Sequence, residues 1–291
     1  MEASDKPVSQ LNPFSTADEH KHPLAIMRLS PVKTATRCGW TLATWCPNIG
    51  ARRSSRHRCR GGEFGCATGG KAMCNLVTLK TSIAEVAQTF FARIGRNTNA
   101  SPGDVYPGYQ GFVIREENEE RLLEAMTWGF PRHSVNRKTG KPNKPNPVNN
   151  ARDDKLMSAH GMWNKWFTDT QYRCLIPFTA FAEAEGETGR MTKSWISVAD
   201  QPLAAWAGLW RPSDEWGDCY TGVMVDATRE LWHIHDRMPV ILEADEHDRW
   251  LHVPAEEAMA LLRQYPADRL RVDQTSEPWS SRRTADTPLL L

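Results

Sequence analysis

The dipeptide Met73-Cys74 offers the most unusual chemistry in this chain of 291 residues. If Met73 is the true or processed start, Cys74 becomes an N-terminal residue with an α-amine beside its thiol. An aldehyde can condense with that amine to a Schiff base, and the thiol can then add to the same carbon and close a five-membered thiazolidine ring. The α-amine has a pKa of about 7.7–8.0 and the thiol about 8.5, so each supplies some nucleophile near neutral pH. Inside an intact chain, the same pair is an ordinary dipeptide.

Polar residues further along the chain could assist such a reaction. Asn150 and Arg152 follow a basic, proline-rich loop at 132–147, although a capped turn followed by a surface arginine would have the same sequence. Glu183 lies in the apolar run 181–184, where an outward-facing carboxylate would only be solvated but a buried one could move protons. Schiff-base formation expels water and ring closure moves a proton, so acid–base groups are expected helpers.

A histidine, an arginine and a tryptophan complete the candidate residues. His235 and Arg237 precede the apolar run 239–242, and a lone histidine in such a place can be structural or catalytic. Trp128 is either a core residue or a platform on which a nucleobase stacks. The spacing of His233 and His235 is a weak metal signal, so we expect no metal site and no cofactor.

The hydrophobic pattern after Cys74 predicts the elements that position these residues. Ser82 and Glu85 form a capping box that opens a helix with an apolar face reaching Ile94, and Gly95 would end it. Further helices are predicted at 154–167, 244–251 and 255–265. Strands are predicted at 76–79, 110–115, 173–177, 194–198, 203–210, 220–225, around 234–242 and at 270–272, and a further strand ends at residue 131. Many strands with few helices predict a single α+β domain of mixed, mostly antiparallel sheets, curled into a barrel-like core and flanked by short helices.

Charge divides the chain at Met73. Residues 1–73 hold 11 Lys and Arg against 5 Asp and Glu, a net charge of +6, and the rest holds 25 against 30, a net charge of −5, which together give the +1 of the whole chain. A net acidic globular part argues against broad coating of duplex DNA but is compatible with a small basic cleft. We expect 1–73 to be disordered, mis-annotated or removed by processing, 74–275 to be the catalytic domain, and 276–291 to be a tail.

The cysteines favour a reducing environment. Four of the seven precede Met73 and none forms a close C-x-x-C pair, which argues against zinc. The other three, Cys74, Cys174 and Cys219, are an odd number without a secretory signal, so we expect a cytoplasmic protein. No run of about 18 apolar residues is present, so we expect no membrane span. Nothing requires more than a monomer.

Taken together, these residues resemble one family, the SOS response-associated peptidase (SRAP) family, also called abasic site processing proteins. The resemblance runs from Met73 to about Thr275. Each fragment alone is weak, and their order and spacing make the match specific. The fragments are Met73-Cys74-Asn75-Leu76, Trp128-Gly129, Asn150-Ala151-Arg152, Arg173-Cys174-Leu175-Ile176-Pro177 leading to Phe181-x-Glu183, and Ile234-His235-Asp236-Arg237-Met238-Pro239.

The resemblance implies a protein of the DNA damage response that detects abasic sites in single-stranded DNA and crosslinks to them, with peptidase and lyase-type activity. The family's cysteine, exposed by loss of the preceding methionine, forms a thiazolidine with the ring-opened sugar aldehyde. Carried over, Cys74 is the nucleophile and Asn150 orients it. Glu183 is the acid–base group, and His235 assists opening of the sugar ring and reversal of the crosslink.

The DNA contacts implied by the resemblance are less complete in this chain. Arg152 and Arg237 would hold phosphates, for which arginine forks are well suited, and Trp128 would lie beside the DNA. Where the family commonly has Gly-Arg after the cysteine, this chain has Asn75-Leu76, so an arginine that often contacts DNA is missing.

Two other functions stay open. One is a cysteine peptidase that acts on other proteins, with the Cys74 thiolate as nucleophile and His235 as base. The other is a single-stranded DNA-binding module in which these residues only stack and bind phosphate, without a covalent step.

Overall fold

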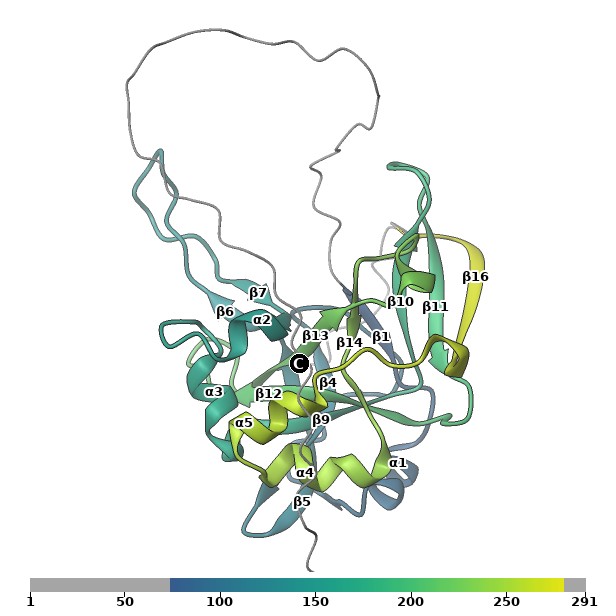
Figure 1. Cartoon of the computed structure of the whole chain (residues 1–291). Helices are drawn as coiled ribbons and strands as arrows, with labels where there is room; N and C mark the ends of the chain where they lie inside the picture. The colour runs from purple at the N-terminus through teal and green to yellow at the C-terminus, as the bar shows by residue number, and fades with distance from the viewer. Residues whose placement is uncertain (1–73, 280–291) are drawn as a thin grey trace, which may run out of the picture. The chain divides into compact units, whose positions relative to one another are not determined.

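The structure, a computed structural model, describes residues 74–279 (Figure 1). The expectations for residues 1–73 and for the chain beyond Trp279 lie outside the described residues. Many strands and few short helices make up the described part, which confirms the predicted α+β class. None of its helices is long and apolar enough to cross a membrane.

The larger sheet closes on itself. Its spatial order is β14 (Arg237–Pro239), β13 (Cys219–Asp226), β12 (Ala204–Arg211), β9 (Arg173–Phe178), β4 (Gln110–Glu117), β5 (Glu120–Trp128) and β2 (Arg93–Ile94), with β15 (Ile241–Leu242) on β12 and β8 (Asn150–Arg152) on β13. Because β13 also pairs with β5, strands β13, β12, β9, β4 and β5 form a closed ring. Three pairs, β13–β5, β13–β8 and β2–β5, are parallel. The other pairs are antiparallel, as predicted.

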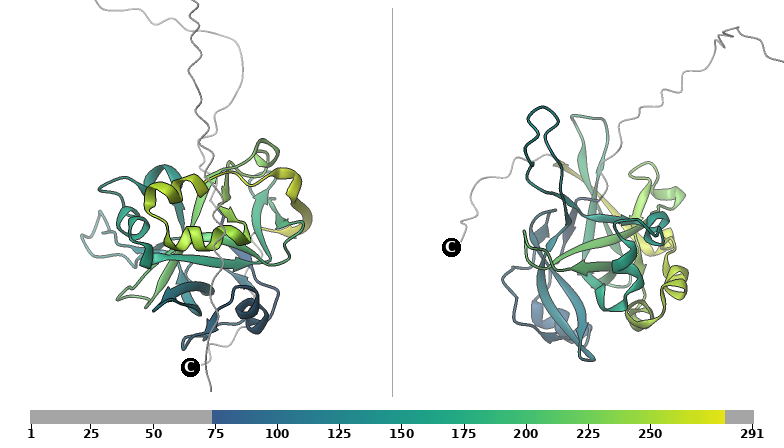
Figure 2. Two further views of the ribbon diagram at one scale, coloured as in Figure 1. Left: turned by 60° about the horizontal axis from the view of Figure 1, so that its bottom comes forward. Right: turned by 90° about the vertical axis from the view of Figure 1, so that its left-hand side faces the viewer.

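A second sheet carries the first strand of the described chain. Its order is β16 (Leu270–Pro278), β11 (Thr192–Val198), β10 (Ala180–Glu185), β1 (Leu76–Thr78) and β3 (Asp104–Val105). A separate hairpin joins β6 (Phe130–Arg132) to β7 (Asn146–Val148) through the basic loop. Figure 2 shows that this loop and the β10–β11 loop project from the same end of the described part. Strand β16 continues past Thr275, where we expected the domain to end.

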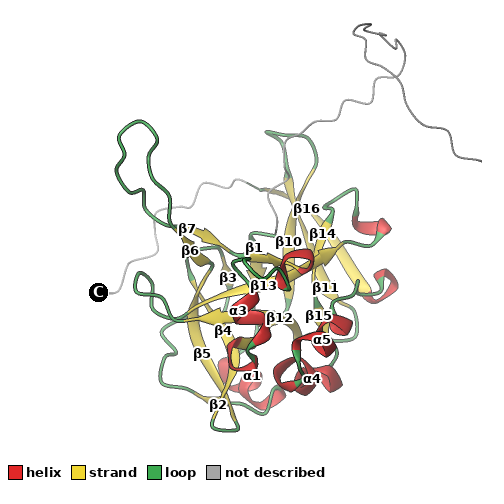
Figure 3. Ribbon diagram, turned by 60° about the vertical axis from the view of Figure 1, so that its left-hand side comes forward, coloured by secondary structure: helices red, strands yellow, loops and turns green. Residues whose placement is uncertain are grey.

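The helices are shorter than predicted. They are α1 (Ile83–Thr89), α2 (Asp153–Leu156), α3 (Asn164–Thr168), α4 (His247–His252) and α5 (Ala255–Ala258), of which α4 and α5 lie next to each other in Figure 3. Ser82 caps α1 as predicted, since its Oγ accepts a hydrogen bond from the Glu85 amide at 3.2 Å. The helix nevertheless ends before Gly95, because Phe91 adopts a left-handed φ of 52°. The single helix predicted at 154–167 is wrong, since a turn closed by the Gly161 amide on Ser158 O separates α2 from α3.

Arg173 ties strand β9 to two helices. Its side chain is buried and donates to the carbonyl oxygens of Phe167 at 2.9 Å, Trp250 at 3.0 Å and Val253 at 2.7 Å. Burial lowers the pKa of the guanidinium to about 10, so it still carries its charge at neutral pH. This residue of the Arg173–Pro177 fragment therefore serves the fold.

A close contact at Gly222 sets the position of β8. A Cβ atom at Gly222 would lie 1.9 Å from Cζ2 of the buried Trp206, whose Nε1 donates to Val223 O at 2.7 Å. The Gly222 amide in turn donates to Asn149 O at 3.2 Å, and Gly222 lies opposite Asn150 in the parallel β13–β8 pair. Any shift of β13 away from Trp206 would therefore move Asn149 and, in β8, Asn150.

We expect Gly222→Ala to lower the free energy of unfolding by about 2–3 kcal/mol, because the added methyl overpacks the core against an indole that cannot rotate away. Urea denaturation measures this loss. Gly189→Ala is the control: Gly189 has a φ of 91° with no atom near the added Cβ, so it adds only backbone strain of about 1–2 kcal/mol. A smaller loss for Gly222→Ala than for Gly189→Ala would contradict the packing explanation.

Candidate functional site

Cys74 lies just before β1 and is fully buried. Its thiol is 3.8 Å from Leu76 O. Strand β1 pairs with β10, with Leu76 opposite Ala182, so the neighbouring residue Glu183 comes from the strand beside Cys74. Glu183 is also buried, with 1% of its surface exposed, so it is not the solvated carboxylate that its sequence context allowed.

The environment of the Cys74 thiol disfavours the thiolate. Burial raises the pKa of this thiol well above its ordinary value, and the negative charge of Glu183 raises the pKa further. A cysteine peptidase needs the opposite, a thiol whose pKa is lowered by a histidine or another cation. The thiol of Cys74 therefore keeps its proton in this structure.

Two asparagine side chains meet at the carbonyl oxygen of Cys74. Asn150 Nδ2 donates to it at 2.9 Å, and Asn149 Nδ2 donates to it at 2.8 Å. Asn149 Nδ2 also donates to Asn75 Oδ1 at 3.1 Å. Sequence reasoning identified Asn150 and missed Asn149; the signal that could have found it is the Asn-Asn doublet at the end of the basic loop.

Trp128 supports these asparagines from inside the core. It is fully buried, its Nε1 donates to Asn149 O at 3.0 Å, and its ring stacks on Tyr220 with centroids 6.3 Å apart. A side chain without exposed surface has no face on which a base could stack. The structure therefore places Trp128 in the core, the first of the two roles its sequence context allowed, where it holds the backbone of Asn149.

His235 lies on the segment that leads into β14. It is 3% exposed, and its Nδ1 accepts a hydrogen bond from the Arg237 amide at 2.9 Å. Two residues earlier, His233 Nε2 lies 3.8 Å from Glu185 Oε1 on β10. The structure thus places the segment carrying His235 beside the strand that carries Glu183.

The two arginines expected to hold phosphates differ in accessibility. The Arg152 side chain is 46% exposed and its Nε lies 2.9 Å from Asp154 Oδ1. The Arg237 side chain is only 11% exposed and pairs with Asp153 at 2.8 Å and Asp226 at 3.2 Å. A phosphate at Arg237 would have to compete with Asp153 and Asp226 in a nearly buried position, whereas at the half-exposed Arg152 it would compete with Asp154 alone.

An open cavity of about 340 Å³ lies beside the asparagines. Its lining residues carry no charge, and they are Asn75, Leu76, Tyr106, Pro107, Pro147, Asn149 and Trp279. Sequence reasoning missed Tyr106 and Trp279, because nothing in their local pattern distinguishes them from other surface aromatics. Aromatic rings of this kind can stack on a nucleobase without reading its sequence.

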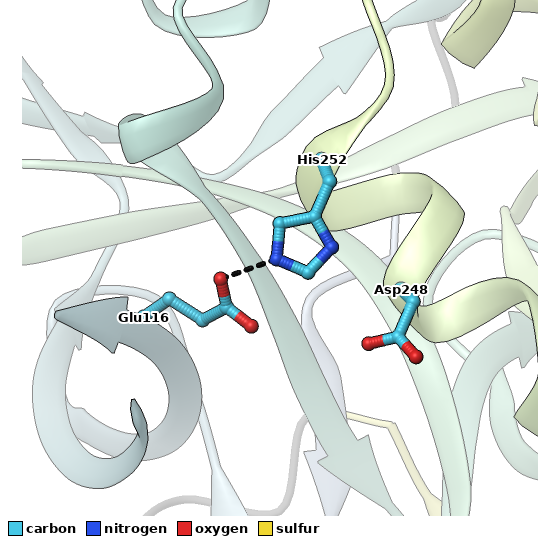
Figure 4. Close-up of side chains that lie close together, drawn as sticks. All are labelled: Glu116, Asp248 and His252. Carbon is cyan, nitrogen blue, oxygen red and sulfur yellow. Dashed lines mark hydrogen bonds and ion pairs between the residues drawn. The ribbon is translucent and has the colours of Figure 1, made fainter. Parts of the chain in front are cut away.

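A separate group of possible metal ligands comes from β4 and α4, neither of which carries a site residue (Figure 4). The ligand atoms of Glu116, Asp248 and His252 lie within 4.8 Å of one another. The guanidinium of Arg121 lies 3.9 Å from Glu116 and 2.6 Å from Asp248, and His252 Nε2 is 2.5 Å from Glu116. Because Arg121 and the ring of His252 already contact these carboxylates, we interpret the group as a surface cluster of ion pairs and hydrogen bonds.

Comparison with known proteins gives one family. A model of the family described as "SOS response associated peptidase (SRAP)" matches residues 73–278. The chain is 30% identical over 178 residues to the abasic site processing protein HMCES of Xenopus tropicalis, covering 50% of each chain. It is 28% identical over 201 residues to HMCES of Gallus gallus, covering 59% of this chain and 57% of that one. The chain thus spans about half the length of the curated relatives it matches.

Solved structures share the fold. A protein from Bordetella bronchiseptica superposes with a TM-score of 0.56 at 25% identity, covering 69% of this chain and 99% of that chain. A protein from Bacteroides thetaiotaomicron has a TM-score of 0.56 at 17% identity, covering 69% of this chain and 91% of that one. A phage-related protein from B. bronchiseptica has a TM-score of 0.53 at 18% identity, covering 69% and 94%. At these identities the last two bear on the fold alone.

Glu183→Gln, in protein that begins at Cys74, should lower the pKa of the Cys74 thiol, because it removes the adjacent negative charge that helps to raise it. The rate of iodoacetamide alkylation at Cys74, followed by mass spectrometry against pH, should therefore rise at lower pH than in the wild type. Glu185→Gln, on the same strand, is the control and should leave the profile in place. Identical profiles for Glu183→Gln and the wild type would contradict the electrostatic account.

Proposed function

Because the chain belongs to the SOS response associated peptidase (SRAP) family, we propose that it captures abasic sites in single-stranded DNA covalently through Cys74. The observation that carries this proposal is the convergence of Glu183, Asn149 and Asn150 on Cys74, the second residue of the family match. The names of the HMCES relatives support abasic sites as the substrate.

The proposed reaction forms two bonds to one carbon. The α-amine of Cys74 attacks the aldehyde carbon of the ring-opened abasic sugar, and the aldehyde oxygen leaves as water with two hydrogens from nitrogen. The thiol sulfur then adds to the carbon of the resulting Schiff base, and the thiol proton ends on the ring nitrogen. Aldehyde and cysteine thus give a thiazolidine and one water.

The electrostatics of the site support this order of steps. A thiol whose pKa is raised keeps its proton, so the amine is the first nucleophile and the thiol follows once the imine carbon is in reach. Glu183, ionised beside Cys74, is the group we assign to take a proton from the amine nitrogen and pass it to the departing oxygen, and later to relay the thiol proton to the ring nitrogen. We assign His235 to opening of the sugar ring and to reversal of the crosslink.

The proposal requires a free amine at Cys74. An amide nitrogen cannot form a Schiff base, so residues 1–73 must be absent or removed, by self-processing or by another peptidase. The functional unit is then the domain that begins at Cys74, and we propose that it acts as a cytoplasmic monomer.

We propose that DNA is held by few charged contacts. The exposed Arg152 is the better placed of the two candidate arginines, and the uncharged cavity with Tyr106 and Trp279 would take an unpaired base. This suits a substrate recognised by its lesion and by its single-stranded character. A lyase-type cleavage of the strand would follow from the Schiff base.

The alternative of a thiolate peptidase is disfavoured by the raised pKa of Cys74. The alternative of a non-covalent DNA-binding module predicts no change of mass on incubation with abasic DNA. Measuring the mass of the protein after incubation with abasic DNA therefore distinguishes the leading proposal from both alternatives.

Protein beginning at Cys74, incubated with single-stranded DNA that contains one abasic site, should gain the mass of the oligonucleotide less one water, in an adduct that survives denaturation. Cys74→Ser should abolish the stable adduct, because no sulfur closes the ring, while borohydride should still trap its Schiff base. Cys219→Ser is the control, since its hydroxyl can keep the hydrogen bond to Arg211 O and the adduct should be unchanged. A stable adduct with Cys74→Ser, or none with the wild type, would refute the mechanism.

A further inference from the structure

Asn149 contacts Cys74 as closely as Asn150 does. Its Nδ2 donates both to Cys74 O at 2.8 Å and to Asn75 Oδ1 at 3.1 Å. The opposite orientation of the amide would bring its oxygen against two other oxygens. The hydrogen bonds therefore place the nitrogen of Asn149 toward Cys74.

The backbone of Asn149 is itself anchored. Its carbonyl oxygen accepts from the indole of Trp128 at 3.0 Å and from the Gly222 amide at 3.2 Å. Trp128 is fully buried, and Gly222 is confined by the contact with Trp206. Asn149 therefore donates from a rigid support.

A rigid support matters because the first residue of a chain is held poorly. Terminal residues are usually mobile unless something ties them down. In protein that begins at Cys74, no preceding peptide restrains the amine, and the carbonyl oxygen is the atom of this residue that two side chains hold. The orientation of the Cys74 amine then depends on how firmly the hydrogen bonds hold the carbonyl oxygen of the same residue.

We propose that Asn149 is a positioning residue of the abasic-site reaction: with Asn150 it clamps the carbonyl oxygen of Cys74, and through Asn75 it fixes the next residue. The clamp presents the amine and the thiol of Cys74 in one orientation. This inference rests on the proposed function of Cys74. It also gives Asn75 a role, because its Oδ1 accepts the second hydrogen bond of the Asn149 amide.

The clamp has an electrostatic consequence for the amine. Amide N–H groups on the carbonyl draw electron density away from the amine side, which favours its neutral, nucleophilic form. Strand β8 contributes Arg152, but its guanidinium is paired with Asp154. The charged group facing Cys74 from β10 is Glu183, which acts in the opposite sense, and His233 and His235 lie on the segment before β14.

The test uses proteins that begin at Cys74 and measures the rate of stable adduct formation with single-stranded DNA bearing one abasic site, from about pH 6 to about pH 9 around the amine pKa. Asn149→Leu should slow the reaction about tenfold at neutral pH, the effect of losing one positioning hydrogen bond. Asn149→Asp should slow it more and move the pH profile to higher pH, because a carboxylate favours the ammonium form. Its deficit should shrink as the pH rises.

Asn146→Asp is the matched control, since it adds the same charge on an exposed residue of β7 and should react as the wild type does. Asn75→Gly removes only the acceptor and should slow the reaction less than Asn149→Leu does. It also serves as the readout if the Asn149 variants do not fold. Melting temperatures are measured for every variant.

Three results would overturn the inference. One is an Asn149→Leu protein that reacts at the wild-type rate. A second is an equal slowing of both Asn149 variants at every pH with equally lowered melting temperatures, which is the result of a purely structural role. The third is an Asn75→Gly protein with the wild-type rate when neither Asn149 variant folds. Absence of an adduct with the wild-type protein would instead remove the proposed function and this inference with it.

Discussion

The pair of hydrogen bonds on the carbonyl oxygen of Cys74 is the interaction on which the site depends. Of their donors, Asn150 opens β8 of the larger sheet and Asn149 directly precedes it, whereas Cys74 leads into β1 of the second sheet. Closure of the strand ring places β13, and β13 holds β8 by parallel pairing. The position of Cys74 is therefore a product of both sheets, and a disturbance in either one reaches it.

Most of the polar groups around Cys74 are uncharged. Amides hold its backbone, one buried carboxylate faces its thiol, and the raised pKa of that thiol follows from burial and from Glu183. Such a site suits an amine that must lose a proton and a thiol that must not lose one too early. It suits a thiolate peptidase poorly, although peptidase is the family's description.

Much of the fold followed from local patterns. The longer strands β4, β9, β11, β12 and β13 were found near their true bounds, because alternating or buried apolar runs persist along each of them. The short strands β2, β3 and β7 were not predicted, and β16 extends to Pro278, well beyond the predicted 270–272. The helices were less accurate: the predicted face of α1 continued to Ile94, which instead lies in β2 after the left-handed Phe91. A backbone reversal at a phenylalanine has no signature in hydrophobic periodicity.

The sequence by itself determined which chemistry is available, because residue types and their order identify the cysteine, the amide, the carboxylate and the imidazole of the family pattern. Tertiary structure decided which of these groups meet and in what state. It buried Trp128, tied Arg237 to Asp153 and Asp226, and added Asn149 to the contacts of Cys74. The burial of these side chains and their contacts arise from pairing between strands far apart in the chain, and that pairing cannot be predicted from the local sequence.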